Sequence, residues 1–421
     1  MGASMTNTAN IFLPTVPRTP AAKTPATQPF PWVGLITLAA AVFLSVTSEM
    51  LPTGLLPEMS ASLNVTESQI GLLVSWFAFT VVVTSAPVAI LTRRFPRHGL
   101  IIIVLVIFAL SSVLTAIAPT YELVVAARVL GGVAHGLFWS VVGAYAAHLV
   151  PKAQIGRAVS ITVAGGTLAF VFGVPLGTAA GHLLGWRLSF VALGVLMLIG
   201  AALVWKFLPP VARDSTSTST TDAAASAPQG GRRDVTIPAV VLICFITGIT
   251  MVGHYSFYTY IAPFLLDGLG VAASQLAPLL FAYGVAGAIG LLLVGTVFGP
   301  RPTLGLVLGL AASAVSVTLL ALFSATLPVA LAAFVLWGMA FGTLPPLMQT
   351  RMLHAASPGI RDTAAAFYTT AFNAGIGGGA LLGAVLIETV GLEFVPLVYV
   401  GLLVVALALV LVTDLIGRRR S

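Results

Sequence analysis

Long uninterrupted apolar stretches, such as residues 101–110 and 400–412, dominate this chain. A helix crosses a bilayer with about 20 predominantly apolar residues, whereas the strands of a large outer-membrane barrel alternate polar and apolar positions over about ten residues. Only 7% of the 421 residues are charged, against about 25% in soluble domains. A soluble globule, a disordered chain and a collagen-like fibre are excluded by this composition. We therefore predict an all-α polytopic membrane protein.

Twelve spans are predicted in two sets of six. They cover residues 32–57, 68–92, 99–118, 121–149, 154–181 and 186–208, and then 236–266, 275–298, 301–324, 327–354, 361–390 and 394–416. Residues 209–235 separate the sets and have the Ser-, Thr-, Ala- and Gly-rich composition of a flexible linker. The predicted organisation is a disordered tail (1–31), a six-helix bundle (32–208), this linker, a second six-helix bundle (236–416) and a basic tail (417–421).

The basic residues predict the orientation. If the N-terminus is cytoplasmic, every Lys and Arg except Arg128 and Arg187 falls in a cytoplasmic segment. Acidic residues gather on the other side, at Glu58, Glu67, Glu122, Asp267, Glu388 and Glu393. This is the positive-inside pattern, and it places both termini in the cytoplasm.

Cysteine, histidine and charge narrow the function classes. The single cysteine, Cys244, forms no intrachain disulfide and is expected to pack in its apolar run. The net charge of +7 does not predict nucleic-acid binding, because the charges lie in the loops between spans. The six histidines are scattered, which disfavours a membrane-embedded enzyme with a nucleophile–base pair or a metal cluster. We expect no metal, no cofactor and a monomer, with the lipid bilayer, protons and a small solute as partners.

Glu49 and Arg128 are strong charges deep inside predicted spans. Both are predicted about 10 Å below the outer surface, from the rise of about 1.5 Å per residue. Charged groups at such depth are costly and usually functional. We predict proton coupling by Glu49 with Arg128 beside it; the alternative is a static ion pair between two helices. His135, two helical turns after Arg128, is either a proton relay or an interhelical hydrogen-bonding group.

Aromatic and polar residues in other spans are candidates for a solute cavity. His254, Tyr255 and Tyr258 form one group, and Trp139, Trp337 and Asn373 lie well inside their own spans. Tyr260 belongs to the same stretch but equally fits an outer aromatic belt, and the tryptophans equally fit plain packing.

Small residues mark close helix packing in two spans. Gly165, Gly173, Gly177 and Gly181 recur at intervals of four or eight in the fifth span, with Pro175 among them. A second glycine run, 375–379 with Gly383, occupies the eleventh span. These are equivalent helices of the two halves, which fits an internal repeat.

Several motifs resemble those of the major facilitator superfamily, and within it the twelve-span drug:proton antiporters. They are GVPLGT at 173–178 with GWR at 185–187, ARVLGGVAHG at 127–136, SEMLPTGLLPEM at 48–59, TYIAPFL at 259–265 and FNAGIGGG at 372–379. The resemblance covers about residues 32–416 and implies two pseudo-symmetric six-helix bundles. It implies that Gly165, Gly173, Pro175 and Gly177 carry the antiporter signature, and that Arg128 occupies a position used in proton transfer. The last three motifs are similar to those of bacterial sugar and small-metabolite efflux proteins, which implies the cytoplasmic membrane of a bacterium.

The loop between the second and third spans departs from the family pattern. AILTRRFPRH at 89–98 keeps Arg94 and Arg97 but has Arg93 where the family carries an Asp. In the family that Asp latches the loop to the eleventh helix in the outward-facing state. We predict a latch of swapped sign between Arg93 and Asp362; the alternative is that Asp362 only favours the start of its own helix.

The predicted function is export of a small organic solute by proton antiport with alternating access. No nucleotide-binding signature is present, so the proton gradient is the expected energy source. A proton symporter or a facilitator that imports its solute on the same fold is the alternative.

Overall fold

A computed structural model describes residues 30–151, 154–209 and 234–418. Most of the predicted tails and nearly all of the predicted linker lie outside these ranges; α16 continues to Arg418, into the predicted basic tail. Twelve helices within them are long and apolar enough to cross a membrane. The spans are α1 (Trp32–Gly54), α3 (Glu67–Thr92), α4 (Arg97–Ile117), α5 (Tyr121–His148), α6 (Ile155–Leu168) continued by η2 (Ala169–Gly173) and α7 (Val174–Leu184), α8 (Trp186–Phe207), α10 (Ile237–Tyr258), α12 (Ala273–Leu293) continued by η4 (Val294–Phe298), α13 (Pro302–Leu322), α14 (Leu327–Ala355), α15 (Arg361–Thr389), and α16 (Val395–Arg418) preceded by η5 (Leu392–Phe394). Short elements α2 (Leu56–Leu63), α11 (Ile261–Pro263) and η3 (Phe264–Gly268) connect some of them. The predicted all-α, twelve-span fold is confirmed.

Two predicted helices, the fifth and the seventh, are interrupted next to a proline. The fifth span contains a π-helical turn, η2, directly before Pro175. The seventh helix ends at Tyr258 rather than near residue 266, and the chain continues in short turns around Pro263. A proline ring has no N–H to donate to the carbonyl four residues earlier, so the regular ladder opens there.

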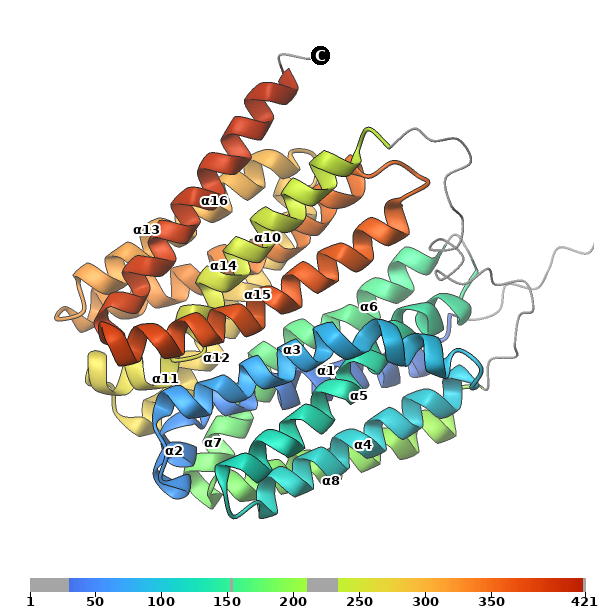
Figure 1. The fold of residues 1–421 in the computed structure, drawn as a ribbon, viewed down its shortest axis with the longest axis horizontal. Helices are drawn as coiled ribbons and strands as arrows, with labels where there is room; N and C mark the ends of the chain where they lie inside the picture. Colours follow the sequence, from blue (N-terminus) through green and yellow to red (C-terminus); the bar gives the residue numbers. More distant parts are fainter. Residues whose placement is uncertain (1–29, 152–153, 210–233, 419–421) are drawn as a thin grey trace, which may run out of the picture.

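The two sets of six helices form two bundles with separate apolar cores (Figure 1). Glycines bring the fifth span against α1: a Cβ at Gly165, Gly173, Gly177 or Gly181 would overlap atoms of α1 or the Leu55 side chain that follows it. In the second bundle, Gly375, Gly379 and Gly383 of α15 approach α10 in the same way. The fifth helix of each half thus packs on the first helix of that half, as the predicted internal repeat requires.

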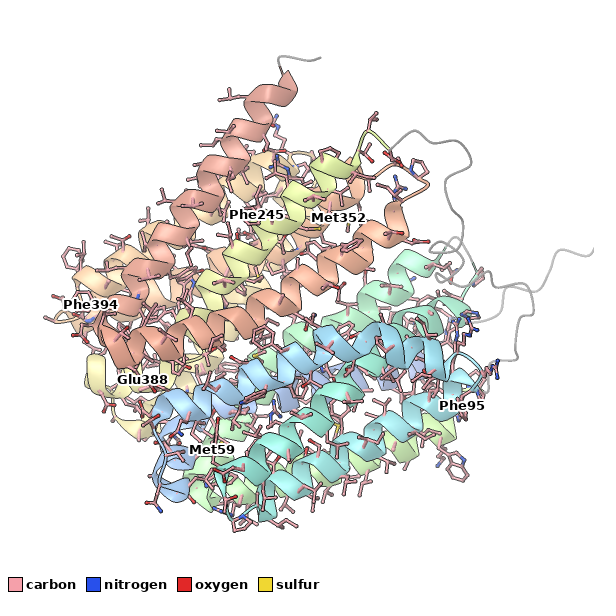
Figure 2. The ribbon with its side chains drawn as sticks, viewed as in Figure 1. Met59, Phe95, Phe245, Met352, Glu388 and Phe394 are labelled. Carbon is pink, nitrogen blue, oxygen red and sulfur yellow. The ribbon has the colours of Figure 1, made fainter. Side chains whose placement is uncertain are left out.

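The charged residues separate the molecule into two ends. We call the end with Arg93, Arg94, Arg97 and Arg157 the basic end, and the end with Glu58, Glu67, Glu122, Asp267 and Glu388 the acidic end. Figure 2 shows Glu388, Met59 and Phe394 at one end and Phe95, from the loop after α3, at the other. Basic and acidic residues thus lie at opposite ends of the molecule, as the positive-inside pattern predicts. That the basic end faces the cytoplasm stays a prediction.

The bundles touch near the acidic end and separate toward the basic end. Helices α3 and α15 meet where the Ser75 hydroxyl donates to the Gly377 carbonyl, at 2.8 Å. Toward the basic end of the same two helices, Val83 is 69% exposed and Phe367 is 63% exposed. Figure 1 shows α3 and α15 diverging in that direction. The structure is therefore closed at the acidic end and open at the basic end.

Both chain segments that flank residues 210–233 are anchored to a bundle. The Tyr145 hydroxyl donates to the Pro209 carbonyl in the first bundle. In the second, Asp234 accepts hydrogen bonds from the Ser357 hydroxyl and from Thr236. These hydrogen bonds, first the one from Ser357, hold the pKa of Asp234 below its ordinary value. The connection between the halves therefore starts and ends at fixed points.

Candidate proton-coupling and solute sites

Glu49, Arg128 and His135 lie together in the first bundle. Glu49 is in the second-last turn of α1, and the other two are on α5. All three side chains are buried, with exposed fractions of 4%, 1% and 2%. The neighbour of Glu49, Met50, packs into the apolar core of the second bundle. The structure thus brings the three predicted residues together, next to a residue that contacts the second bundle; their role in proton coupling stays a prediction.

Arg128 joins α5 to α1 through the backbone rather than through the Glu49 carboxylate. Its guanidinium donates to the carbonyls of Ser48, at 2.7 Å, and Glu49, at 2.9 Å. The Ser48 carbonyl would normally accept from the residue four positions later, but that residue is Pro52, which has no N–H. Arg128 supplies the missing donor. No side-chain ion pair joins Glu49 to Arg128 among the described residues, so the static ion pair that was the alternative is not formed in this conformation.

The Glu49 carboxyl group is only partly satisfied. Its Oε2 atom lies 3.5 Å from Nε2 of His135. Its Oε1 atom is buried without a hydrogen-bond partner among the described residues. A buried carboxylate with an unpaired oxygen is costly when charged, and such groups inside a membrane are usually functional.

His135 is held at both ring nitrogens. The Trp139 indole donates to Nε2 at 2.7 Å, and the Ser45 hydroxyl lies 3.0 Å from Nδ1. An indole N–H only donates, so Nε2 is the unprotonated nitrogen and Nδ1 carries the hydrogen. The rings of Phe77 and Phe108 pack edge-on against the imidazole. His135 is therefore a neutral, oriented imidazole beside Glu49.

Most of the predicted solute residues form an aromatic cluster in the second bundle. His254 stacks on Phe341 and on Tyr258, with ring centroids 3.3 and 5.2 Å apart. Tyr255 and Trp337 lie 4.9 and 5.2 Å from the same imidazole. The structure brings together His254, Tyr255, Tyr258 and Trp337, which we call the His254 cluster. Its members are buried against one another.

Two other predicted solute residues lie elsewhere. Trp139 is in the first bundle, bonded to His135. Asn373 donates to the Thr369 carbonyl of its own helix, at 2.9 Å. Tyr260, which equally fitted an outer aromatic belt, is fully buried and donates to the Ala380 carbonyl, so the belt reading is wrong for it.

Sequence reasoning missed two residues of these sites. Ser45 lies four residues before Glu49, and this spacing places both on one face of α1. The four-residue spacing could have identified Ser45 as a neighbour of Glu49 from the sequence. Tyr399 accepts from the Trp337 indole at 3.2 Å and its hydroxyl lies 3.4 Å from His254 Nδ1, but it comes from α16, and no local pattern connects it to them.

The residues of the predicted latch do not meet in this conformation. Arg93 caps the end of α3 and Asp362 lies in the first turn of α15; both side chains are exposed. No ion pair joins them in the ranges that the structure describes. Arg97, in the same loop, lies 3.5 Å from His148 Nδ1. A latch that closes in the outward-facing state is expected to be open here, so the swapped pair stays a prediction.

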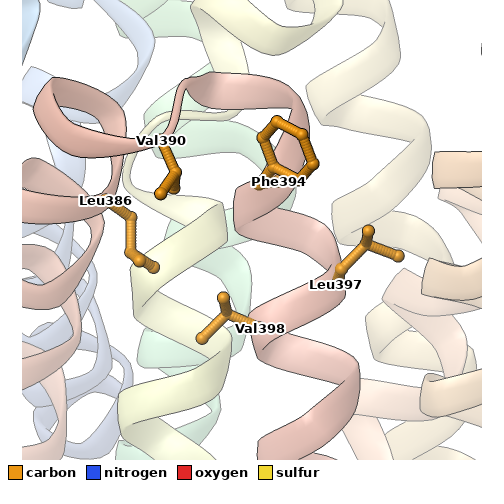
Figure 3. Close-up of a pocket in the computed structure, with 5 residues that line it drawn as sticks. All are labelled: Leu386, Val390, Phe394, Leu397 and Val398. Atoms are coloured by element: carbon orange, nitrogen blue, oxygen red, sulfur yellow. The ribbon is translucent and has the colours of Figure 1, made fainter.

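A hollow of about 520 Å³ lies between the ends of α15 and α16 (Figure 3). Five apolar side chains line it: Leu386, Val390, Phe394, Leu397 and Val398. None of them offers a hydrogen-bonding group, so this hollow is a poor candidate for recognition of a polar solute.

Comparison with known families decides the class of the protein. The Major Facilitator Superfamily profile matches residues 38–301 and 243–420. The chain belongs to the Major Facilitator Superfamily. Together with the twelve apolar helices, this membership makes it a multi-pass membrane protein.

Solved structures of this superfamily share the fold at low sequence identity. A D-xylose–proton symporter is 17% identical, with a TM-score of 0.77, over 90% of this chain and 97% of that one. A bacterial homologue of the human lysosomal transporter Spinster, inward-facing and occupied, is 18% identical, with a TM-score of 0.71, over 92% and 97%. The human organic anion transporter MFSD10 is 15% identical, with a TM-score of 0.66, over 90% and 98%. At these identities the likeness establishes the fold, and family and fold together support transport rather than an enzymatic reaction.

Proposed function

We propose that this protein exports a small organic solute across the cytoplasmic membrane of a bacterium in exchange for protons. The observation that carries the proposal is the buried Glu49 carboxyl group, whose Oε1 has no partner among the described residues, next to Met50, which packs into the core of the second bundle. Protons bind there, and the basic end faces the cytoplasm, as the positive-inside pattern supports.

The working cycle uses the two ends in turn. In the conformation described here the basic end is open, and a solute enters from the cytoplasm while Glu49 loses its proton. The bundles then rock so that the acidic end opens, the solute leaves, and Glu49 takes a proton from outside. Arg128 holds the Glu49 backbone at constant depth throughout, because its bonds go to carbonyl groups rather than to the carboxylate.

The residue types of the His254 cluster support a solute class. In this conformation its members are buried against one another, and they supply rings and hydroxyl groups but no Asp, Glu, Lys or Arg side chain. Rings and hydroxyls suit neutral or weakly charged organic molecules, such as sugars, nucleosides or amphenicol-type drugs. No nucleic acid, metal or cofactor is needed by this mechanism, and one chain suffices for it.

Gradient-driven uptake into proteoliposomes tests the proposal. The purified protein is reconstituted, and a labelled hexose, pentose, nucleoside and amphenicol are each added outside. An antiporter accumulates its solute when the vesicle interior is acidic, whatever the orientation of the protein. Accumulation driven by an acidic exterior would instead establish a symporter, and equilibration that ignores the pH gradient would establish a facilitator; either result overturns the antiport proposal.

A further inference from the structure

A single nitrogen of His135 faces two partners. Nε2 accepts the Trp139 indole hydrogen at 2.7 Å and also lies 3.5 Å from the Glu49 carboxyl oxygen Oε2. An unprotonated ring nitrogen has one lone pair, so it serves one donor at a time. In the described conformation the indole occupies it.

The surroundings of His135 limit the groups that act on it. Glu49 from α1 and Arg128 from its own helix are the charged groups nearby, while α3 and α4 contribute the rings of Phe77 and Phe108. Ser45 holds the opposite nitrogen. Ser45, Glu49 and His135 are buried, whereas Trp139 is half-buried and so can respond to a bound molecule.

We propose that Trp139 is a switch on the proton path, and that a solute with a hydrogen-bond acceptor opens it by drawing the indole N–H away from His135. This inference rests on the proposed function and gives the solute one required feature, which is a carbonyl, ether or hydroxyl oxygen. Trp139 is thus a positioning residue for proton transfer as well as a contact for the solute.

The proton balance of the step is simple. Once the indole leaves, the O–H bond of protonated Glu49 breaks and an N–H bond forms at His135 Nε2. The products are a carboxylate and an imidazolium. The imidazolium then gives the Nε2 proton to water at the open basic end and returns to its neutral form. While the indole stays in place, this transfer is blocked, so proton release depends on solute.

Nitrogen NMR of isotope-labelled histidine in the full protein in lipid tests the switch. The chain has six histidines, and His135→Gln identifies the signal of interest. In the wild type we expect His135 to keep the neutral form with hydrogen on Nδ1 between about pH 5 and 8, the range in which free histidine titrates. In Trp139→Phe, which keeps a ring but loses the N–H, Nε2 should gain a proton as the pH is lowered in that range.

Two controls keep the result interpretable. Trp205→Phe changes an indole that is 73% exposed on the outside of the bundle and should match the wild type. Trp139→Gln retains an N–H donor at the same position and should behave like the wild type. A change seen only in Trp139→Phe is then due to loss of the N–H donor rather than loss of the indole ring. Identical titration of His135 in the wild type and Trp139→Phe, or hydrogen on Nε2 in the wild type, overturns the inference. Because no transport is measured, such a result leaves the uptake test of antiport untouched.

Discussion

The guanidinium of Arg128 donates a 2.9 Å hydrogen bond to the backbone carbonyl of Glu49 and not to its carboxylate. The companion bond to the Ser48 carbonyl supplies the donor that Pro52 lacks. The carboxyl group is left without a permanent cationic partner. An acid that is buried but not neutralised is suited to exchange protons, whereas one locked in an ion pair is not.

Removal of the Arg128 guanidinium should destabilise the first bundle strongly. Arg128→Met removes two hydrogen bonds to buried carbonyls and leaves the Ser48 carbonyl without any donor, and hydrogen bonds from charged groups contribute about 1.5–3 kcal/mol each. We expect the free energy of unfolding in detergent to fall by about 3 kcal/mol or more. Arg187→Met is the matched control, because Arg187 also makes two hydrogen bonds but at the acidic-end surface, where about 1 kcal/mol is typical. Equal losses for the two variants would contradict this account of Arg128.

The acidic end closes around Tyr260. Its ring lies against Gly71 of the first bundle and Gly383 of the second, where a Cβ at either glycine would overlap it. Gly71→Ala should therefore shift the molecule toward opening at the acidic end, at a cost to the closed form of about 1–3 kcal/mol. Spin labels at Ala61 and Glu393, both exposed at that end, should report a longer distance. Gly156→Ala, where a Cβ meets nothing within 4 Å, should leave the distance unchanged; a similar distance in both variants would contradict the closure.

Two adjacent glycines of the fifth span should respond oppositely to alanine. A Cβ at Gly165 would overlap the backbone carbonyl of Ala39, which cannot turn away. A Cβ at Gly166 would make ordinary contacts, at 3.8 Å, with Val42 and Val46. Gly165→Ala should lower the melting temperature, and Gly166→Ala should leave it unchanged or raise it, since alanine is favoured over glycine in a helix by about 0.5–1 kcal/mol. The reverse order would show that α1 and the fifth span pack differently.

The latch of swapped sign predicts rescue by double charge reversal. Arg93→Asp should slow solute uptake into vesicles, because Asp362 would then face a like charge in the outward-facing state. Asp362→Arg added to it should restore most of the rate. Arg97→Asp, in the same loop but beside His148, should not be rescued by Asp362→Arg. Failure of the first rescue would leave Asp362 as a residue that only favours the start of its own helix.

The fold was largely predictable because apolar length and the placement of charges are local properties of the sequence. The breaks near Pro175 and Pro263 were less so, since prolines inside helices are often accommodated by neighbouring groups. Helical spacing correctly brought Glu49, Arg128 and His135 together. It did not predict that Arg128 bonds to carbonyl groups, although Pro52 is the reason and is visible in the sequence.

Contacts between distant segments account for the remaining differences. Tyr260 is buried because Gly71, far away in the sequence, leaves room for its ring. Trp139 bonds to His135 rather than joining the His254 cluster, because the cluster is built from the second bundle. These contacts depend on which helices pack against one another, and the hydropathy pattern of the sequence does not encode that packing.

The most direct test of the central claim is solute movement by Glu49→Gln in proteoliposomes, with the solute that the wild type transports. Glutamine keeps the shape of the side chain but cannot carry the coupled proton. We predict that exchange of labelled for unlabelled solute continues, while accumulation driven by an acidic interior is lost. Glu58→Gln, a change at the acidic end where Glu58 pairs with His182, should retain both activities. Gradient-driven accumulation by Glu49→Gln at the wild-type level would contradict the assignment of Glu49 as the proton-coupling residue.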